Sequence, residues 1–330
     1  MSKIRMNIRQ GSLIAALVFL LLVPVISLNS DYLMHFFVLC FIWGVAAEAW
    51  NLIMGYAGIF SFGQIAFFTI GAFTAGLLTL QLGVSPWLGM PIAGVLAALV
   101  GFLIGLPSLR LRGEYIALVT YALHMLLSPL IYRGNLIGIE TGGFIWNIPA
   151  LSLFGYTFPR DAVLPWYYVG LGLFVLFLLI IHRIIRSPIG RAFVALRDAE
   201  PFAQSLGVNE YKYKLIVFSI SAFITGTIGA FYAYYVATIS TRMLGLDYFV
   251  KTLIMVVLGG LGGFPGAAIG AFVITFAFEL MRPLMSYRLI LLGVLVILIM
   301  IYMPNGLIGS SAYLKHIKRW KLFRQAEETK

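Results

Sequence analysis

Residues 33–54 read LMHFFVLCFIWGVAAEAWNLIM, and this stretch decides the class of fold. It is long enough to cross the hydrocarbon core of a bilayer as a helix, which takes about 20 apolar residues at a rise of about 1.5 Å each. Glu48 is its one residue among Asp, Glu, Lys and Arg. Because a helix satisfies its backbone polar groups internally, the stretch predicts a membrane-spanning helix.

Similar apolar stretches follow along the whole chain. The sequence is 61% hydrophobic and 11% charged, whereas a soluble domain has about 25% charged residues. The alternation over runs of about 10 residues that is typical of an outer-membrane barrel is missing. We therefore expect an all-α, polytopic membrane protein with about ten transmembrane helices, at roughly 12–28, 33–54, 60–81, 87–106, 115–132, 164–182, 214–237, 248–263, 265–281 and 288–303.

Basic residues predict the orientation of these spans. With ten spans, 17 of the 23 Lys and Arg residues fall on the side that holds both chain ends, and six, including Arg242 and Lys251, fall on the other side. Positive residues favour the cytoplasmic side, so we expect both termini there. We interpret 1–310 as a single transmembrane domain with a retained first helix, and 311–330 as a basic cytoplasmic tail that contacts anionic lipid.

Two connections are longer than simple turns, an outer loop at 133–163 and an inner loop at 183–213. Ser187 and Pro188 predict a helix start in the inner loop. Asp198 offers a second cap, and Gly207 offers a left-handed stop, which predicts a separate helix of about two turns. A helix this short is marginal alone, so something must bury it. Its acidic and small residues favour a protein groove over the bilayer surface.

Polar residues accompany a break between the second and third spans. Gly55 and Gly63 interrupt an apolar run beside Asn51, Ser61 and Gln64. Transporters use broken helices to handle polar solutes inside the membrane, which makes these side chains candidates for lining a pathway. A plain cytoplasmic turn explains the same pattern, and the sequence leaves both interpretations open.

Two further features point to the same kind of pathway. Gly259 and Gly260 begin a second glycine-rich break between apolar runs. Glu48 lies within a span, where an ionisable group must be paired or hydrated. It faces a pathway or accepts hydrogen bonds from a neighbouring helix, and the sequence does not decide between them.

Motifs for catalysis are missing from the sequence. No Gly-x-x-x-x-Gly-Lys-Ser/Thr motif is present, so we do not expect the chain to hydrolyse ATP itself. Cys40 is the one cysteine, and no Cys or His pair has metal-site spacing. We therefore expect neither an enzyme nor a bound cofactor.

The inner loop carries a resemblance to a known family. The segment GRAFVALRDAE at 190–200, with Gly207-Val208 beyond it, resembles the cytoplasmic coupling loop of LivM-type permease subunits of branched-chain amino acid ABC importers. Five further segments resemble that family in order: NLIMGYAGIFSFGQIAFF at 51–68, LPSLRLRGEY at 106–115, TGG at 141–143, VVLGGLGGFPG at 256–266 and PNGLIG at 304–309. Phe202 departs from the usual pair of alanines, and the bulky 144–149 departs from a usually small or polar stretch.

The resemblance implies roles for individual residues. Those expected to couple the chain to an ATPase are Arg191, Arg197, Asp198, Glu200, Ala203 and Gly207. The two glycine-rich breaks, the acid inside a span and the outer-loop motif together give the residues expected to line the translocation pathway, which are Glu48, Asn51, Ser61, Gln64, Thr141, Gly142, Gly143, Gly259 and Gly260.

The resemblance also implies partners and a location. These are a homologous, LivH-like second permease subunit, two ABC ATPase subunits that bind ATP and Mg, a periplasmic solute-binding protein and lipids of the bacterial inner membrane. Nucleic acid is not expected, because the positive-inside rule explains the net charge of +11. An ABC permease for urea or short amides, an ion-coupled secondary transporter and a membrane-bound enzyme are the alternatives.

Overall fold

The computed structural model of the chain describes residues 18–24, 30–108, 115–133, 143–153, 156–160 and 162–281, together with scattered positions between 287 and 307. Six helices in this part are long and apolar enough to cross a membrane. They are Asp31–Tyr56, which joins α2 (Asp31–Asn51) to the π-helix η1 (Leu52–Tyr56), α3 (Gln64–Leu82), α4 (Pro86–Ser108), α5 (Tyr115–Tyr132), α6 (Val163–Arg186) and α8 (Glu210–Val236). The chain is thus a helical, multi-pass membrane protein.

Two more helices, α9 (Leu246–Gly259) and α10 (Gly266–Leu280), are shorter. Their 14 and 15 residues rise about 21 and 22 Å, less than the hydrocarbon core of about 30 Å. The expected spans at 12–28 and 288–303 fall mostly outside the described residues. The count of ten spans and the cytoplasmic position of both ends therefore stay predictions.

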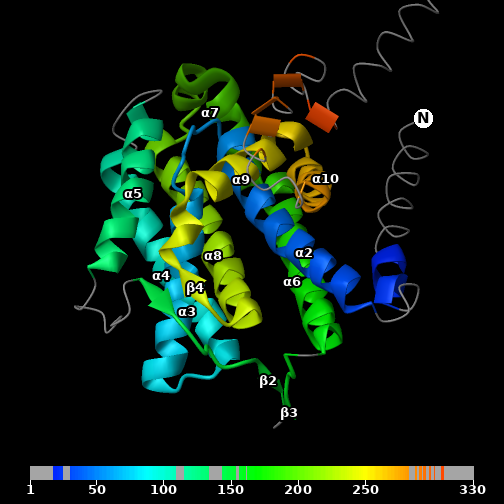
Figure 1. Cartoon of the computed structure of the whole chain (residues 1–330). Coiled ribbons are helices and arrows are strands. Elements are labelled where there is room, and N and C mark those ends of the chain that lie inside the picture. Colours follow the sequence, from blue (N-terminus) through cyan, green and yellow to red (C-terminus); the bar gives the residue numbers. More distant parts are fainter. Residues whose placement is uncertain are drawn as a thin grey trace, which may run out of the picture.

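Helix α2 lies in the core, and α8 packs against α3 and α4 (Figure 1). Every residue of α2 from Cys40 to Asn51 is buried, as expected for a helix that is apolar on all sides. Glycines bring α3 and α8 close together. A Cβ added at Gly71 would lie 2.0 Å from the carbonyl oxygen of Gly226, so only glycine fits this contact.

The two ends of the bundle differ. Helix α7 (Pro188–Ser205) caps one end, and the hairpin of β2 (Ser152–Leu153) and β3 (Tyr156–Thr157) lies at the opposite end (Figure 1). Strand β1 (Phe144–Ile145) pairs antiparallel with β4 (Ile239–Ser240), which follows α8. Each strand has two residues, so the all-α class is unaffected.

The chain returns from α8 as irregular backbone and not as a helix. Strand β4 leads into the 3₁₀ turn η3 (Thr241–Leu244), and α9 begins after Gly245. The ring centroids of Tyr248 and Trp43 lie 5.8 Å apart, and those of Phe249 and His124 lie 5.6 Å apart. Because Trp43 and His124 lie near the middles of α2 and α5, the α8–α9 connection reaches the middle of the bundle.

This depth corrects one detail of the sequence analysis. The helix expected from residue 248 is confirmed as α9, which begins at Leu246, and β4 and η3 form the connection before it. Arg242 and Lys251 were counted as outer-surface charges, but both belong to this deep segment. The Lys251 ammonium lies 5.1 Å from the Trp43 ring centroid and 4.7 Å from that of Phe278. Hydropathy did not reveal the difference, because Arg242 lies in a polar stretch that resembles an ordinary surface connection.

Candidate functional site

Asn51, the last residue of α2, holds the turn between α9 and α10. Its Nδ2 donates to the carbonyl oxygen of Gly263 at 3.1 Å, and its Oδ1 accepts from the backbone N–H of Gly262 at 2.9 Å. The side chain is fully buried. One amide thus satisfies both a donor and an acceptor of a turn more than 200 residues away in sequence.

Glu48 lies one turn earlier on α2 and joins it to α10. One carboxylate oxygen accepts from the backbone N–H of Ala268 at 3.0 Å, and the other accepts from Asn51 Nδ2 at 3.1 Å. Ala268 lies in the first turn of α10, where a helix favours negative charge. Of the two interpretations left open by the sequence, this geometry favours a carboxylate held by a neighbouring helix.

The π-helix η1 connects this cluster to α7. The carbonyl oxygen of Gly55 accepts a hydrogen bond from Arg197 Nη1 at 2.6 Å. A Cβ at Gly55 would lie 2.2 Å from the backbone nitrogen of Gly262, so the close approach of η1 to the α9–α10 turn requires glycine. A continuous chain of contacts therefore runs from α7 into the bundle, through Arg197, Gly55, Gly262 and Asn51.

The expected division of the inner loop into two helices is confirmed. Ser187 Oγ accepts from the N–H of Gly190 at 3.3 Å, which caps the start of α7. Helical geometry breaks at Ala199, with φ −154° and ψ 75°. Gly207 has φ +86°, and the N–H of Val208 reaches the carbonyl of Ala203, which together make a Schellman stop.

The candidate coupling residues lie on different sides of this loop. Asp198 accepts from Arg197 Nε at 2.8 Å and makes no cap, contrary to expectation. Glu200 pairs with Lys214 Nζ at 3.0 Å. Arg191 is exposed and donates to a backbone carbonyl at 3.4 Å.

The short helix after Ala199 has one inward and one outward face. Ala203 is buried, whereas the side chains of Phe202 and Leu206, four residues apart, are 67% and 70% exposed. The departure at Phe202 from the family pattern thus lies on this outward face.

Ser61 and Gln64 connect helices and do not line an open space. Gln64 Nε2 donates to Ser221 Oγ at 2.9 Å and also to Thr225 Oγ1, both on α8. The carbonyl oxygen of Ser61 accepts from Trp50 Nε1 at 2.8 Å. Both residues are fully buried, so the structure gives them a packing role.

The remaining pathway candidates are glycines and one threonine. Gly259 packs against α10, where an added Cβ would lie 2.2 Å from the Gly266 carbonyl oxygen. Gly260 begins the turn that follows, with φ +98°. The carbonyl of Gly143 accepts from the N–H of Thr241 at 3.1 Å. Thr141 and Gly142 lie outside the described residues.

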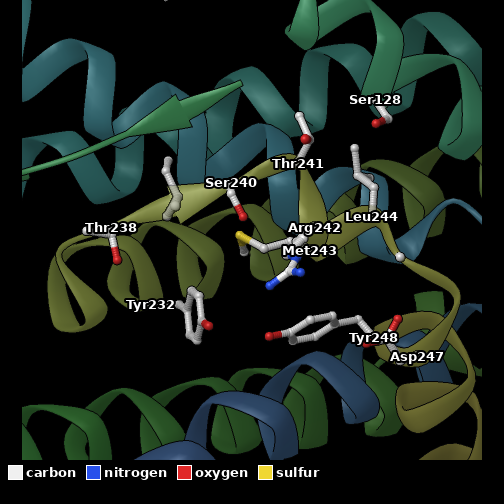
Figure 2. A pocket seen from close by; sticks show the side chains of 12 residues that line it. Ser128, Tyr232, Thr238, Ser240, Thr241, Arg242, Met243, Leu244, Asp247 and Tyr248 are labelled. Carbon is white, nitrogen blue, oxygen red and sulfur yellow. The ribbon is translucent and has the colours of Figure 1, made fainter. Parts of the chain in front are cut away.

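A cavity of about 670 Å³ lies beside the irregular α8–α9 connection, and the sequence analysis did not predict it. Its lining comes from α5, the end of α8, β4, η3 and the start of α9. The guanidinium of Arg242 points into the space between the hydroxyl groups of Tyr232 and Tyr248, and Asp247 lies near Tyr248 (Figure 2). None of the predicted pathway residues lines this cavity, although Gly143 contacts its Thr241 edge.

The sequence did contain a signal for this cavity. Residues 238–247 read TISTRMLGLD, a polar and charged interruption between two apolar runs. Assigned to the outer surface, it resembled an ordinary connection. Only the packing of this segment against the middles of α2 and α5 shows its depth.

Comparison with known proteins identifies the family. A family model described as the permease component of the branched-chain amino acid transport system matches residues 32–301. The chain belongs to this family. Members of the branched-chain amino acid permease family are membrane subunits, in agreement with the apolar helices described above.

Individual relatives show which members of this permease family the chain resembles. The chain is 36% identical over 281 residues to the high-affinity branched-chain amino acid transport system permease protein LivM of Escherichia coli (strain K12). This match covers 78% of the chain and 65% of that relative. The probable LivM of Methanocaldococcus jannaschii is 28% identical over 309 residues, covering 78% of the chain and 88% of the relative.

A second branch of the permease family is more distant. The permease protein LivH of Escherichia coli (strain K12) is 30% identical over 125 residues, which cover 37% of the chain and 40% of that relative. No solved structure shows a significant match to the chain. The resemblance to LivM-type permeases inferred from the motifs is confirmed.

Proposed function

We propose that this chain is one permease subunit of an ATP-driven ABC importer that carries branched-chain or related hydrophobic amino acids across the bacterial inner membrane. Its family and its 36% identity to a LivM permease support the substrate class. A homologous, LivH-like subunit forms the second half of the pathway, since relatives of both kinds match the chain.

One observation carries the ATP-driven part of this proposal. The short helix of α7 turns Phe202 and Leu206 outward, while Arg197, just before the kink, reaches the carbonyl oxygen of Gly55 at 2.6 Å. A partner seated on the outward face would therefore move a loop that is joined to η1 and, through Asn51, to the α9–α10 turn. This arrangement fits a docked ATPase that drives a change in the bundle.

The remaining partners follow from this assignment. Two ABC ATPase subunits hold ATP and Mg, and the α7 end of the bundle faces them in the cytoplasm. A periplasmic binding protein delivers solute to the opposite end, where β2 and β3 lie. The chain contributes the pathway and the coupling contact, with no catalytic step of its own.

The test is reconstitution of the chain with its second permease, ATPase and binding protein in liposomes. Leucine, isoleucine and valine, with urea, acetamide and nucleosides as competitors, are supplied with ATP or with an ion gradient. Nucleosides are included because a nucleoside ABC permease, NupC of Lactococcus lactis, is 26% identical over 190 residues. ATP-dependent leucine uptake is expected. Uptake driven by an ion gradient alone would contradict the ABC mechanism, and preference for another solute would replace the substrate.

A further inference from the structure

Two charged side chains in the deep α8–α9 segment have no polar partner within the described part of the chain. Arg242 and Asp247 are exposed, while Met243 and Leu244 between them are buried. No hydrogen bond or ion pair among the described residues involves either charged side chain. A charge at membrane depth faces a water-filled cavity or another protein chain, because lipid is a poor solvent for it.

The backbone of this segment leads to the same conclusion. The irregular segment runs inward from β4, which pairs with β1 of the outer loop, through η3 to Tyr248 and Phe249, whose rings pack on Trp43 and His124 near the middles of α2 and α5. Irregular backbone at this depth is tolerated where it lines water or packs on protein. The cavity of about 670 Å³ lies directly beside this irregular backbone.

The charges of the cavity have opposite signs and different chemistry. A guanidinium such as that of Arg242 binds a carboxylate with two parallel N–H donors. Helix α9 starts at Leu246, so the positive end of its dipole adds to the attraction for an anion. Asp247, one residue further on, offers carboxylate oxygens to an ammonium group. The pair matches the two ends of a zwitterion.

The remaining lining suits an apolar side chain. Ile239 and Met243 contribute aliphatic surface, and Tyr232 and Tyr248 contribute ring surface with hydroxyl groups that face each other (Figure 2). A volume of about 670 Å³ lies within the range of about 300–1,000 Å³ typical of small-molecule sites.

We propose that this cavity is a binding site for a free α-amino acid in the translocation pathway, where Arg242 holds the α-carboxylate and Asp247 holds the α-ammonium group. The proposal rests on the importer function proposed above and adds the place where the solute pauses inside the membrane. The second permease subunit covers the open side of the cavity.

The experiment measures equilibrium binding to the purified complex of both permeases and the ATPase, without the binding protein. The probes are leucine, 3-methylbutylamine, which lacks the carboxylate, and 4-methylpentanoate, which lacks the ammonium group. The variants are Arg242→Gln and Asp247→Asn. Matched controls are Lys212→Gln and Asp31→Asn, which remove exposed charges away from the cavity. Size-exclusion chromatography and basal ATP hydrolysis establish that each complex is assembled.

Wild-type complex is expected to prefer leucine over both analogues. Arg242→Gln should weaken leucine binding by about 30-fold or more and bind leucine and 3-methylbutylamine alike. Asp247→Asn should bind leucine and 4-methylpentanoate alike, and both controls should behave as wild type. When removal of a ligand group and removal of a side chain change the binding free energy by amounts that do not add, the group and the side chain interact.

Three results overturn the site. The first is an Arg242→Gln complex that still prefers leucine over 3-methylbutylamine as the wild type does. The second is a wild-type complex that imports leucine but shows no saturable leucine binding. The third is loss of complex assembly in both variants, which would make the two charges contacts between subunits. Failure of the importer function appears separately, as the absence of ATP-dependent amino acid uptake by the wild-type complex with its binding protein.

Discussion

Arg197 is the side chain that joins α7 to the bundle. Its guanidinium donates to Gly55 at 2.6 Å and to Asp198 at 2.8 Å, and its aliphatic part packs where a Cβ at Gly58 would meet it. A charged donor to a carbonyl contributes about 1.5–3 kcal/mol. The contact is thus strong enough to transmit a movement of α7 to η1.

Replacement of Arg197 by alanine should uncouple ATP hydrolysis from transport. We expect uptake in liposomes to fall about tenfold or more, while ATP hydrolysis continues, because the ATPase-facing side of α7 is intact. Both rates are measured in the same liposomes. Arg183→Ala, which removes an exposed guanidinium at the end of α6, is the matched control. Equal losses of uptake in the two variants would argue against a specific role for the Gly55 contact.

The hydrogen bonds of Asn51 lead to a prediction about the stability of the folded protein. Asn51→Leu keeps the side chain's approximate volume but leaves the Gly262 N–H and the Gly263 carbonyl without their partner. Each buried group left unsatisfied costs about 1–3 kcal/mol, so the free energy of unfolding should fall by about 2–4 kcal/mol. Thermal unfolding in detergent measures this. Gln204→Leu, which changes an exposed amide, should shift the midpoint little, and a similar loss in both would contradict the argument.

At the scale of elements, the short helix of α7 presents two apolar side chains to a partner. Phe202→Ser with Leu206→Ser should leave the chain folded, because both side chains are 67–70% exposed. Association with the ATPase should weaken, since buried anchors at an interface are worth about 2 kcal/mol or more each. Co-purification measures the effect. Leu82→Ser, also 70% exposed but at the end of α3, is the control, and intact association in the double variant would remove the docking role.

Helices whose ends are set by residues next to them in the sequence could be predicted from the sequence. Ser187 and Gly207 mark the ends of α7 through rules that involve only neighbouring residues, and both positions are confirmed. The apolar lengths of α2 to α6 and α8 were equally readable.

Contacts between distant segments could not be predicted in the same way. Glu48 meets Ala268, which is 220 residues away, and nothing near Glu48 in the sequence names that partner. The cavity was missed for a related reason. The sequence analysis placed 238–247 as a connection on the outer surface, whereas η3 carries Arg242 inward towards the point where α9 packs on α2 and α5.

For the whole molecule, orientation in the membrane is the property to test. With α7 in the cytoplasm, Ser205→Cys should react with a membrane-impermeant maleimide from the inside, and Thr157→Cys from the outside. Both positions are exposed. Cys40, the single native cysteine, is fully buried and should give a low background. The reversed labelling pattern would place the ATPase contact on the wrong side and overturn the orientation.

The irregular backbone between β4 and α9 has a consequence for isotope exchange. Amide protons in the cores of membrane helices exchange with deuterium slowly, because their hydrogen bonds are internal and water is absent. The segment Ile239 to Gly245 has only the two-residue ladder of β4 with β1 and a 3₁₀ turn, and it borders the proposed cavity, so its amide protons should exchange faster than those of the helix cores. Mass spectrometry of the peptide covering Ile239 to Gly245 would then follow, without any attached probe, when water enters and leaves the centre of the protein during each cycle.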